Sequence, residues 1–372
     1  MMAGMPGPPE RAVRVSTLEL FFDLVFVFTI TQLTGVLVSG KDATAALQVM
    51  VMLLVVWWIY DGYAWLTNAI PTERVRYRLT LICGMGGFLV MALAIPDAYD
   101  SAGLAFGLGY LVVVVVHGAM YVKGTSVSEV AAILRIVPFN LAAATLVIVG
   151  GALGGTSQWA LWTLAAALLW VTPYLTTTEG FVISPSHFVE RHGLVIIIAL
   201  GESIVVIGAG AAALAVDAGL LLVALLSLAL SAGLWWLYFS DEGAMADAMV
   251  EAPPERRLQL ALTGFGYWHY GLLLGIVALA AGLKVSIGDP YETLGGWIAV
   301  ELAAGVALFV ACDVGFRRVL GIAGGSVRLM AAVAALATIP LGLEVAASAQ
   351  VGTLAAVVAG ALLLEGSRVP PA

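Results

Sequence analysis

The sequence predicts an all-α polytopic integral membrane protein with about twelve transmembrane helices, arranged as two six-helix parallel repeats. Hydrophobic residues make up 62% of the 372 residues and charged residues only 11%, whereas soluble domains carry about 25% charge. Apolar stretches near the roughly 20 residues that cross a bilayer recur along the chain. Similar segments also recur in the same order in the second half. The expected surroundings are therefore lipid.

Twelve apolar stretches are separated by charged or Pro/Gly-rich breaks. They cover residues 18–38, 44–66, 78–96, 102–122, 130–152, 157–175, 191–214, 217–239, 257–283, 292–313, 326–343 and 345–364. The loops between them are too short to fold as soluble domains, and no GxxxxGK(S/T) stretch occurs, so a built-in ATPase is excluded. The net charge of −8, with 16 basic residues, excludes a nucleic-acid partner.

The basic residues predict the orientation, because cytoplasmic loops retain Lys and Arg. Apart from Arg135 and Arg328, which fall inside spans, twelve basic residues lie on the N-terminal side and only Lys41 and Lys284 on the other. The twelve are Arg11, Arg14, Arg74, Arg76, Arg78, Lys123, Arg191, Arg256, Arg257, Arg317, Arg318 and Arg368. We therefore expect both termini to be cytoplasmic, which requires an even number of spans.

Several segments of the first half recur in the second. The second span ends in "WWIYDG" (57–62) and the eighth in "WWLYFSDE" (235–242), and the loops that follow read "ERVRYRL" (73–79) and "ERRLQL" (255–260). Duplicated halves are common in transporter folds. The order of these matches predicts a duplication of six spans.

The same comparison pairs charged residues. Arg135 matches Arg328, and Glu19 in the first span matches Glu190 in the seventh. Six spans per half return the chain to its starting side, so the halves would be related by an axis along the membrane normal. We expect a flexible cytoplasmic N-terminus, two six-helix halves and a C-terminal tail, at residues 1–16, 17–180, 181–366 and 367–372.

Charged residues gather where the spans meet the cytoplasmic boundary. Glu19 and Asp23 are four residues apart and therefore share one helix face. The other members of this layer are Asp61, Arg135, Glu190, Arg191, His192 and Arg328. Because a lone charge in hydrocarbon costs a few kcal/mol, we expect Arg135 to pair with Glu19 or Asp23, and Arg328 with Glu190.

Fewer ionisable groups are expected deeper in the membrane. Glu202 lies about 18 Å along its helix from Glu190, at 1.5 Å per residue, and Glu301 and His269 are placed at similar depth. A carboxylate there favours its protonated form unless a cation neutralises it. Such groups form proton relays and cation sites in membrane proteins.

Structural roles are the alternative for these residues. Glu19 and Asp23 could cap the first helix, Glu202 could be a hydrogen-bonded acid that holds two helices together, and His269 could be a packing residue. No compact metal or nucleophile motif occurs, so no catalytic residue, metal or cofactor is predicted. A divalent metal held by the cytoplasmic carboxylates, as in a lipid-modifying enzyme, is a weaker alternative.

Three motifs resemble the bacterial low temperature requirement A (LtrA) proteins. They are "STLELFFDLVFVFTITQLT" (16–34), "YDGYAWLTN" (60–68) and "HFVERHGLVIIIALGESIVVIG" (187–208). The resemblance covers nearly the whole chain and implies a bacterial inner-membrane protein needed for growth in the cold. The family signature residues it implies are Glu19, Phe22, Asp23, Asp61, Glu190, Arg191, His192, Gly201, Glu202 and Ser203. More distantly, "FFDLVFVFTIT" is similar to the first span of potassium channels with six-span repeats, although Phe22 replaces their Ser.

These features favour a secondary transporter or permease for an unidentified small solute or ion, and the deep ionisable groups allow proton coupling. The alternatives are a cation channel of two six-span repeats and a membrane enzyme or structural factor. The expected partners are the lipid bilayer and the solute, and the sequence does not indicate the oligomeric state. A shared aqueous space bordered by Asp23, Glu202 and His269 would favour transport. Separate helix contacts for these three residues would favour structural roles.

Overall fold

The computed structural model describes residues 15–70, 74–212 and 214–367, and no strand occurs in these ranges. The all-α prediction is therefore confirmed. The helices are α1 Thr17–Gly40, α2 Ala43–Ala69, α3 Val75–Ala94, α4 Gly103–Gly124, α5 Val127–Leu153, α6 Gly155–Leu175, α7 Pro185–Ala211, α8 Ala218–Phe239, α9 Glu242–Glu251, α10 Pro254–Leu260, α11 His269–Gly288, α12 Gly296–Val319, α13 Ser326–Leu336, α14 Ile339–Glu344 and α15 Ala347–Gly366. A short turn, η1 Ile95–Asp97, follows α3, and a π-helical segment, η2 Ala261–Trp268, joins α10 to α11.

Eleven stretches of the described chain are long and apolar enough to cross a membrane, which confirms a multi-pass membrane protein. They coincide with eleven of the predicted spans, and one of them is built from α13 and α14 in succession. The remaining predicted span, 157–175, is α6. Its 21 residues reach about 32 Å at 1.5 Å per residue, but polar residues such as Gln158 and Thr172 make it less apolar than the others.

The connection between α8 and α11 is helical where the sequence analysis expected a loop. Arg257 explains part of this difference, because its guanidinium donates to the backbone carbonyls of Met249, Val250 and Ala252 at the end of α9. Basic side chains satisfy the unpaired carbonyls at helix C-termini in this way. Pro254 begins α10, where its missing N–H leaves no helical hydrogen bond unmade.

The first residues of α1 form a capping box. Ser16 is the N-cap, and its side chain accepts from the Glu19 backbone N–H while the Glu19 carboxylate accepts from the Ser16 backbone N–H at 2.8 Å. This arrangement satisfies two backbone groups that lack helical partners. Ser184 is the N-cap of α7, with Pro185 at the first helical position. Both helices therefore begin on a serine.

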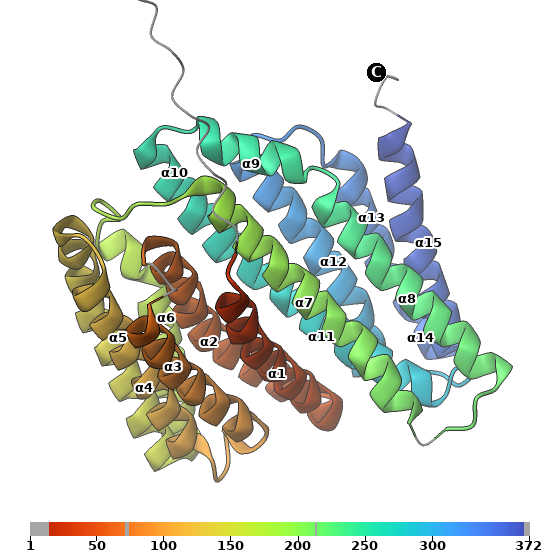
Figure 1. Ribbon diagram of the computed structural model, residues 1–372. Helices are drawn as coiled ribbons and strands as arrows, with labels where there is room; N and C mark the ends of the chain where they lie inside the picture. The colour runs from red at the N-terminus through yellow and green to blue at the C-terminus, as the bar shows by residue number, and fades with distance from the viewer. Residues whose placement is uncertain (1–14, 71–73, 213, 368–372) are drawn as a thin grey trace, which may run out of the picture.

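The helices form two groups that meet at α1 and α2 on one side and α7 and α11 on the other (Figure 1). Within the first group, α1 packs on α2 and α3, and the chain then continues with α3 on α4, α4 on α5 and α5 on α6. Within the second, α7 packs on α8 and α11, followed by α11 on α12, α12 on α13 and α13 on α15. The order of neighbours is the same in both groups.

Close helix contacts at glycines occur in both groups. A Cβ on Gly87 of α3 would lie 2.9 Å from the carbonyl oxygen of Gly109 in α4, and a Cβ on Gly275 of α11 would lie 2.8 Å from that of Gly305 in α12. Small residues let helix backbones approach closely in membrane proteins, where dispersion contacts drive association. These glycines therefore let α3 approach α4 and α11 approach α12.

Candidate functional site

An ion pair between Asp23 and Arg191 joins α1 to α7. Arg191 Nη1 donates to Asp23 Oδ2 at 3.0 Å, and Nη2 lies 2.9 Å from Oδ1. The Tyr60 hydroxyl on α2 also donates to Asp23 Oδ1. The side chains of Asp23 and Arg191 are 0% and 1% exposed, so the guanidinium neutralises the carboxylate where neither reaches solvent. The Nη1 contact is a charge-assisted hydrogen bond, which is roughly twice as strong as one between neutral groups.

A second contact, Glu19 with His187, lies one turn closer to the helix starts. His187 Nε2 is 3.2 Å from Glu19 Oε1, and the Asn68 side-chain amide lies 3.1 Å from His187 Nδ1. Asn68 Oδ1 accepts from the backbone N–H of Ser184 at 2.7 Å, which fixes the amide so that its NH₂ faces the ring. His187 therefore accepts at Nδ1 and donates at Nε2 to Glu19, as a neutral imidazole does.

The third contact joins Asp61 on α2 to His192 on α7. His192 Nε2 lies 3.0 Å from Asp61 Oδ1, and His192 Nδ1 lies 2.9 Å from the backbone carbonyl of Phe188. A carbonyl only accepts, so Nδ1 carries a proton. The Nε2 to Oδ1 contact needs a second proton, because a bare nitrogen lone pair would face a carboxylate lone pair. His192 and Asp61 thus hold one extra proton between them.

The acids and bases of these three contacts come from different helix groups, and we name the set the inter-group cluster. Its members are Glu19, Asp23, Tyr60, Asp61, His187, Arg191 and His192, of which all but Asp61 are at most 3% exposed. Glu19 and Asp23 therefore turn toward the protein interior. The sequence analysis did not single out His187 or Tyr60, although each lies four residues or fewer from a residue that it did.

His269 lies beside the cluster and bonds to no acid. Its Nδ1 donates to the Gly264 carbonyl at 3.1 Å, and the Tyr238 hydroxyl lies 2.8 Å from its Nε2. Its ring centre is 5.4 Å from that of His192. The π-helical segment η2 supplies both the Gly264 carbonyl and the Gly266 carbonyl, which accepts from Trp57 Nε1 at 2.7 Å. Such segments frequently occur at functional sites.

The predicted partners of the two intramembrane arginines were wrong. Arg135 donates to the backbone carbonyls of Thr177 and Glu179 in the connection between α6 and α7, because α5 lies at the periphery of the first group, away from α1. Arg328 on α13 donates to Asp313 of α12 and to Glu365 of α15, with Nη2 2.9 Å from a Glu365 oxygen. These partners are nearer because α13 packs on α12 and α15.

Glu190 lies outside the cluster. Its side chain is exposed, and Oε2 accepts from the backbone N–H of Val15 at 3.3 Å. The reason is helical geometry: residues four apart share a face, so His187 and Arg191 point together toward α1 while Glu190 points to another side. The sequence match of Glu19 with Glu190 is therefore three residues out of step with the contact of Glu19 with His187.

Glu202, Ser203 and Glu301 are buried away from the inter-group cluster. The Thr31 hydroxyl lies 2.7 Å from Glu202 Oε2, whereas the other Glu202 oxygen, the Ser203 hydroxyl and both Glu301 carboxylate oxygens have no hydrogen-bond partner among the described residues. Glu202 lies 17 residues beyond the start of α7, or about 26 Å at 1.5 Å per residue. It thus belongs to the opposite part of the bundle from Arg191. Asp23, Glu202 and His269 therefore face three different helix contacts and not one shared space.

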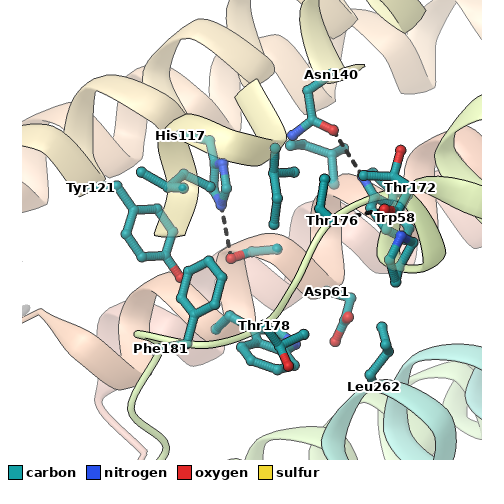
Figure 2. Close-up of a pocket in the computed structure, with 16 residues that line it drawn as sticks. Trp58, Asp61, His117, Tyr121, Asn140, Thr172, Thr176, Thr178, Phe181 and Leu262 are labelled. Atoms are coloured by element: carbon teal, nitrogen blue, oxygen red, sulfur yellow. Dashed lines mark hydrogen bonds between the residues drawn. The ribbon is translucent and has the colours of Figure 1, made fainter. Parts of the chain in front are cut away.

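A pocket of about 70 Å³ lies beside Asp61, between the first helix group and Leu262 of η2. Figure 2 shows Asp61 between Thr178 and Leu262, with His117 and Tyr121 of α4 also facing the space. Its lining residues are Trp58, Ile59, Asp61, Gly62, Trp65, His117, Tyr121, Ile133, Ile136, Asn140, Thr172, Pro173, Thr176, Thr178, Phe181 and Leu262. Asp61 is therefore a member of the inter-group cluster that also borders a pocket.

A second pocket lies at the end of the other helix group, between α8, α12, α13 and α15. Its volume is about 360 Å³, and it is lined by charged residues already paired with each other, among them Asp241 with Arg317 and Arg328 with Glu365. Arg317, Asp241 and Glu365 were not singled out in the sequence. They follow span ends, where charged residues are expected at an interface.

The chain matches the model of the bacterial low temperature requirement A protein (LtrA) over residues 14–363. It is also similar to protein RA0937 of Rhizobium meliloti (strain 1021), with 30% identity over 317 residues that cover 81% of this chain and 76% of that protein. The match spans both helix groups and every member of the inter-group cluster. The chain therefore belongs to the LtrA family of bacterial membrane proteins.

Proposed function

We propose that the chain is a secondary transporter, a permease coupled to protons, for a small solute or ion. The observation that carries this proposal is the row of three acid–base contacts inside the boundary between two helix groups. Removing charges from water is costly even when they are paired, and ionisable residues within spans are typical of ion and solute pathways. A purely structural interface in lipid would be cheaper to build from apolar and small residues.

Two helix groups that evolved by duplication would suit such a mechanism. Glu19 with His187 and Asp23 with Arg191 are both contacts between residues 168 positions apart. The N-caps, Ser16 and Ser184, are separated by the same 168 positions. Two helices related by a twofold axis between them meet at their own equivalent residues. This register, with the shared order of neighbours, supports a duplication at 17–180 and 181–366.

The equivalent positions carry opposite charges. A duplicated pair that kept Asp at both positions would place two carboxylates against each other, whereas Asp23 and Arg191 attract. We propose that this divergence holds the two halves together in one state and leaves the remaining surface free to rock around it. Alternating access in transporters with repeats is largely rigid-body motion of one half against the other.

We further propose that the protein spans the bacterial inner membrane with both termini in the cytoplasm. Twelve basic residues against two favour this orientation. The inter-group cluster and the pocket beside Asp61 would then lie toward the cytoplasmic side, because α1 and α7 begin there. A tag at either end should be digested by protease only in inside-out vesicles.

The transport proposal is tested with the full-length protein in liposomes that enclose a pH-sensitive dye. A proton gradient is imposed, and panels of amines, amino acids, carboxylates and alkali cations are added outside. We expect one class to dissipate the gradient with the wild type and with the exposed Asp97→Asn control, but not with Asp61→Asn. Single-channel currents in planar bilayers, without any solute-dependent proton flux, would contradict the proposal.

A further inference from the structure

The wall of the pocket beside Asp61 is aromatic and acidic. Rings of Trp58, Trp65, Tyr121 and Phe181 surround a space into which Asp61 brings a carboxylate. No Lys or Arg is among the sixteen lining residues (Figure 2). Aromatic faces and a carboxylate both attract positive charge, and the apolar remainder of the wall favours an occupant with an apolar body.

Several hydrogen-bond donors of this wall are already in use. Trp58 Nε1 donates to Asn140 Oδ1 at 3.0 Å, and His117 Nε2 donates to the Gly62 carbonyl at 2.9 Å. The hydroxyls of Thr172 and Thr176 donate to helix carbonyls at 2.7 and 2.9 Å. These groups therefore present ring faces and oxygen lone pairs to the pocket, which suits a cation better than an anion.

One carboxylate oxygen of Asp61 is available to a ligand. Oδ1 faces His192, whereas within the described residues no hydrogen bond reaches Oδ2. The Asp61 side chain is 11% exposed, compared with 1% for His192. A solute in the pocket would thus meet Asp61 Oδ2 directly and would sense the His192 proton through the same carboxylate.

His192 differs from the other three histidines in its proton count. His187, His269 and His117 each have contacts that a neutral ring with one proton satisfies. His192 faces a backbone carbonyl on one side and a carboxylate on the other. The His192–Asp61 pair therefore binds one proton as either imidazolium with carboxylate or imidazole with carboxylic acid, and its net charge is then zero.

We propose that the pocket binds a small organic cation with an apolar body, and that binding releases the proton shared by Asp61 and His192. The charge balances: the neutral pair loses H⁺ to water and becomes a carboxylate with a neutral imidazole, and the cation supplies the missing positive charge. This inference rests on the proposed transport function and assigns its substrate class. It makes the exchange electroneutral, with one cation moved for each proton.

Other titratable groups surround the pair and are already partnered. They are Tyr60 on α2, Glu19 and Asp23 on α1, His187 and Arg191 on α7, His269 and Tyr238 near η2, and His117 and Tyr121 on α4. Arg191 is held by Asp23, so it leaves the charge of Asp61 uncompensated once the proton departs. This arrangement makes the shared proton and the cation competitors for one site.

The test uses phenethyltrimethylammonium, which has no neutral form and no acidic proton of its own. Binding to the full-length protein in detergent is measured by titration calorimetry in three buffers of different ionisation enthalpy. We expect tighter binding than for 2-phenylethanol or 3-phenylpropanoate by at least about tenfold, and release of up to about one proton per cation bound. The affinity should rise with pH by up to about tenfold per pH unit, because proton and cation compete.

Variants distinguish a loss of cation binding from a loss of folding. Asp61→Asn should lose the preference for the cation and the proton release, while Asp97→Asn should keep both, and melting temperatures of both should stay near the wild type. If Asp61→Asn misfolds, Trp58→Leu, which removes one ring face, should weaken cation binding at least about threefold with the neutral alcohol unaffected. Equal binding of cation and alcohol by the wild type would overturn the inference.

The binding outcome is separable from the transport outcome. Cation binding with proton release in detergent, but no flux in liposomes, would keep the site and remove the transporter. Proton-coupled flux of another solute class, without cation binding, would keep the transporter and overturn the substrate class.

Discussion

Asp23 and Arg191 each lie seven residues after the serine that caps its helix, and they form a buried ion pair between α1 and α7. The contact therefore links matching turns of two parallel helices. The guanidinium of Arg191 neutralises the carboxylate of Asp23 and also joins α1 to α7. The Tyr60 hydroxyl and the guanidinium together bond to both oxygens of Asp23. The following predictions separate these roles.

Breaking this pair from either side should destabilise the protein. Asp23→Asn and Arg191→Gln should each lower the free energy of unfolding by about 3 to 5 kcal/mol, because each leaves a buried partner uncompensated. The double variant should lose less than the sum. Denaturation in detergent measures all three against Asp97→Asn, and additive losses would show that the two residues act independently.

The two intramembrane arginines should differ in their contribution to stability. Arg328 is 1% exposed and contacts three carboxylates, so Arg328→Met should cost about 3 kcal/mol or more. Arg135 is half-buried and bonds only to backbone carbonyls, so Arg135→Met should cost about 1 kcal/mol. Similar melting temperatures for the two variants would contradict the assigned partners.

Neighbouring glycines of α3 provide a matched pair for helix packing. A Cβ on Gly87 would lie 2.7 Å from Val113 Cγ2 and 2.9 Å from the Gly109 carbonyl oxygen, whereas nothing lies within 4 Å of a Cβ on Gly86. Gly87→Ala should therefore lower the unfolding free energy by about 1 to 3 kcal/mol. Gly86→Ala should leave it unchanged or raise it by up to about 1 kcal/mol. A neutral Gly87→Ala would show that α3 and α4 are farther apart than described.

Glu202 should affect transport without affecting cation binding. Glutamine preserves a partner for Thr31, so Glu202→Gln should fold normally and bind phenethyltrimethylammonium as the wild type does. Its proton-coupled flux should fall at least about tenfold if the unpartnered oxygen serves the far part of the pathway. Glu344→Gln, an exposed substitution, is the control. Unchanged flux would assign Glu202 a structural role.

Most of the fold could be predicted from the sequence, because long apolar stretches identify the membrane spans. The site was harder to predict, because the sequence does not show which residues contact each other. Spans follow from about 20 apolar residues in a row, and the α1 and α7 motifs contained Glu19, Asp23, Arg191 and His192. Their partners depended on which helices pack together and on which side of each helix a residue lies. The exposure of Glu190, beside the buried Arg191, shows that one position along a helix decides this.

The pocket beside Asp61 was not predictable for a related reason. Its wall combines residues of α2, α4, α5 and α6 with the connection after α6 and with Leu262 of η2. Each of these helices alone has the sequence of an ordinary apolar span. Trp58 fits an aromatic belt in the sequence, but the fold turns it toward Asn140. The order of the helices along the chain does not show which side chains meet in this pocket, because that also depends on the angles at which the helices pack.

The most direct test of proton-coupled exchange at Asp61 is flux of phenethyltrimethylammonium in proteoliposomes, measured with and without an imposed membrane potential. One proton should leave for each cation that enters, the rate should not depend on the potential, and Asp61→Asn should abolish both fluxes. Cation entry that follows the membrane potential and persists in Asp61→Asn would contradict the exchange mechanism.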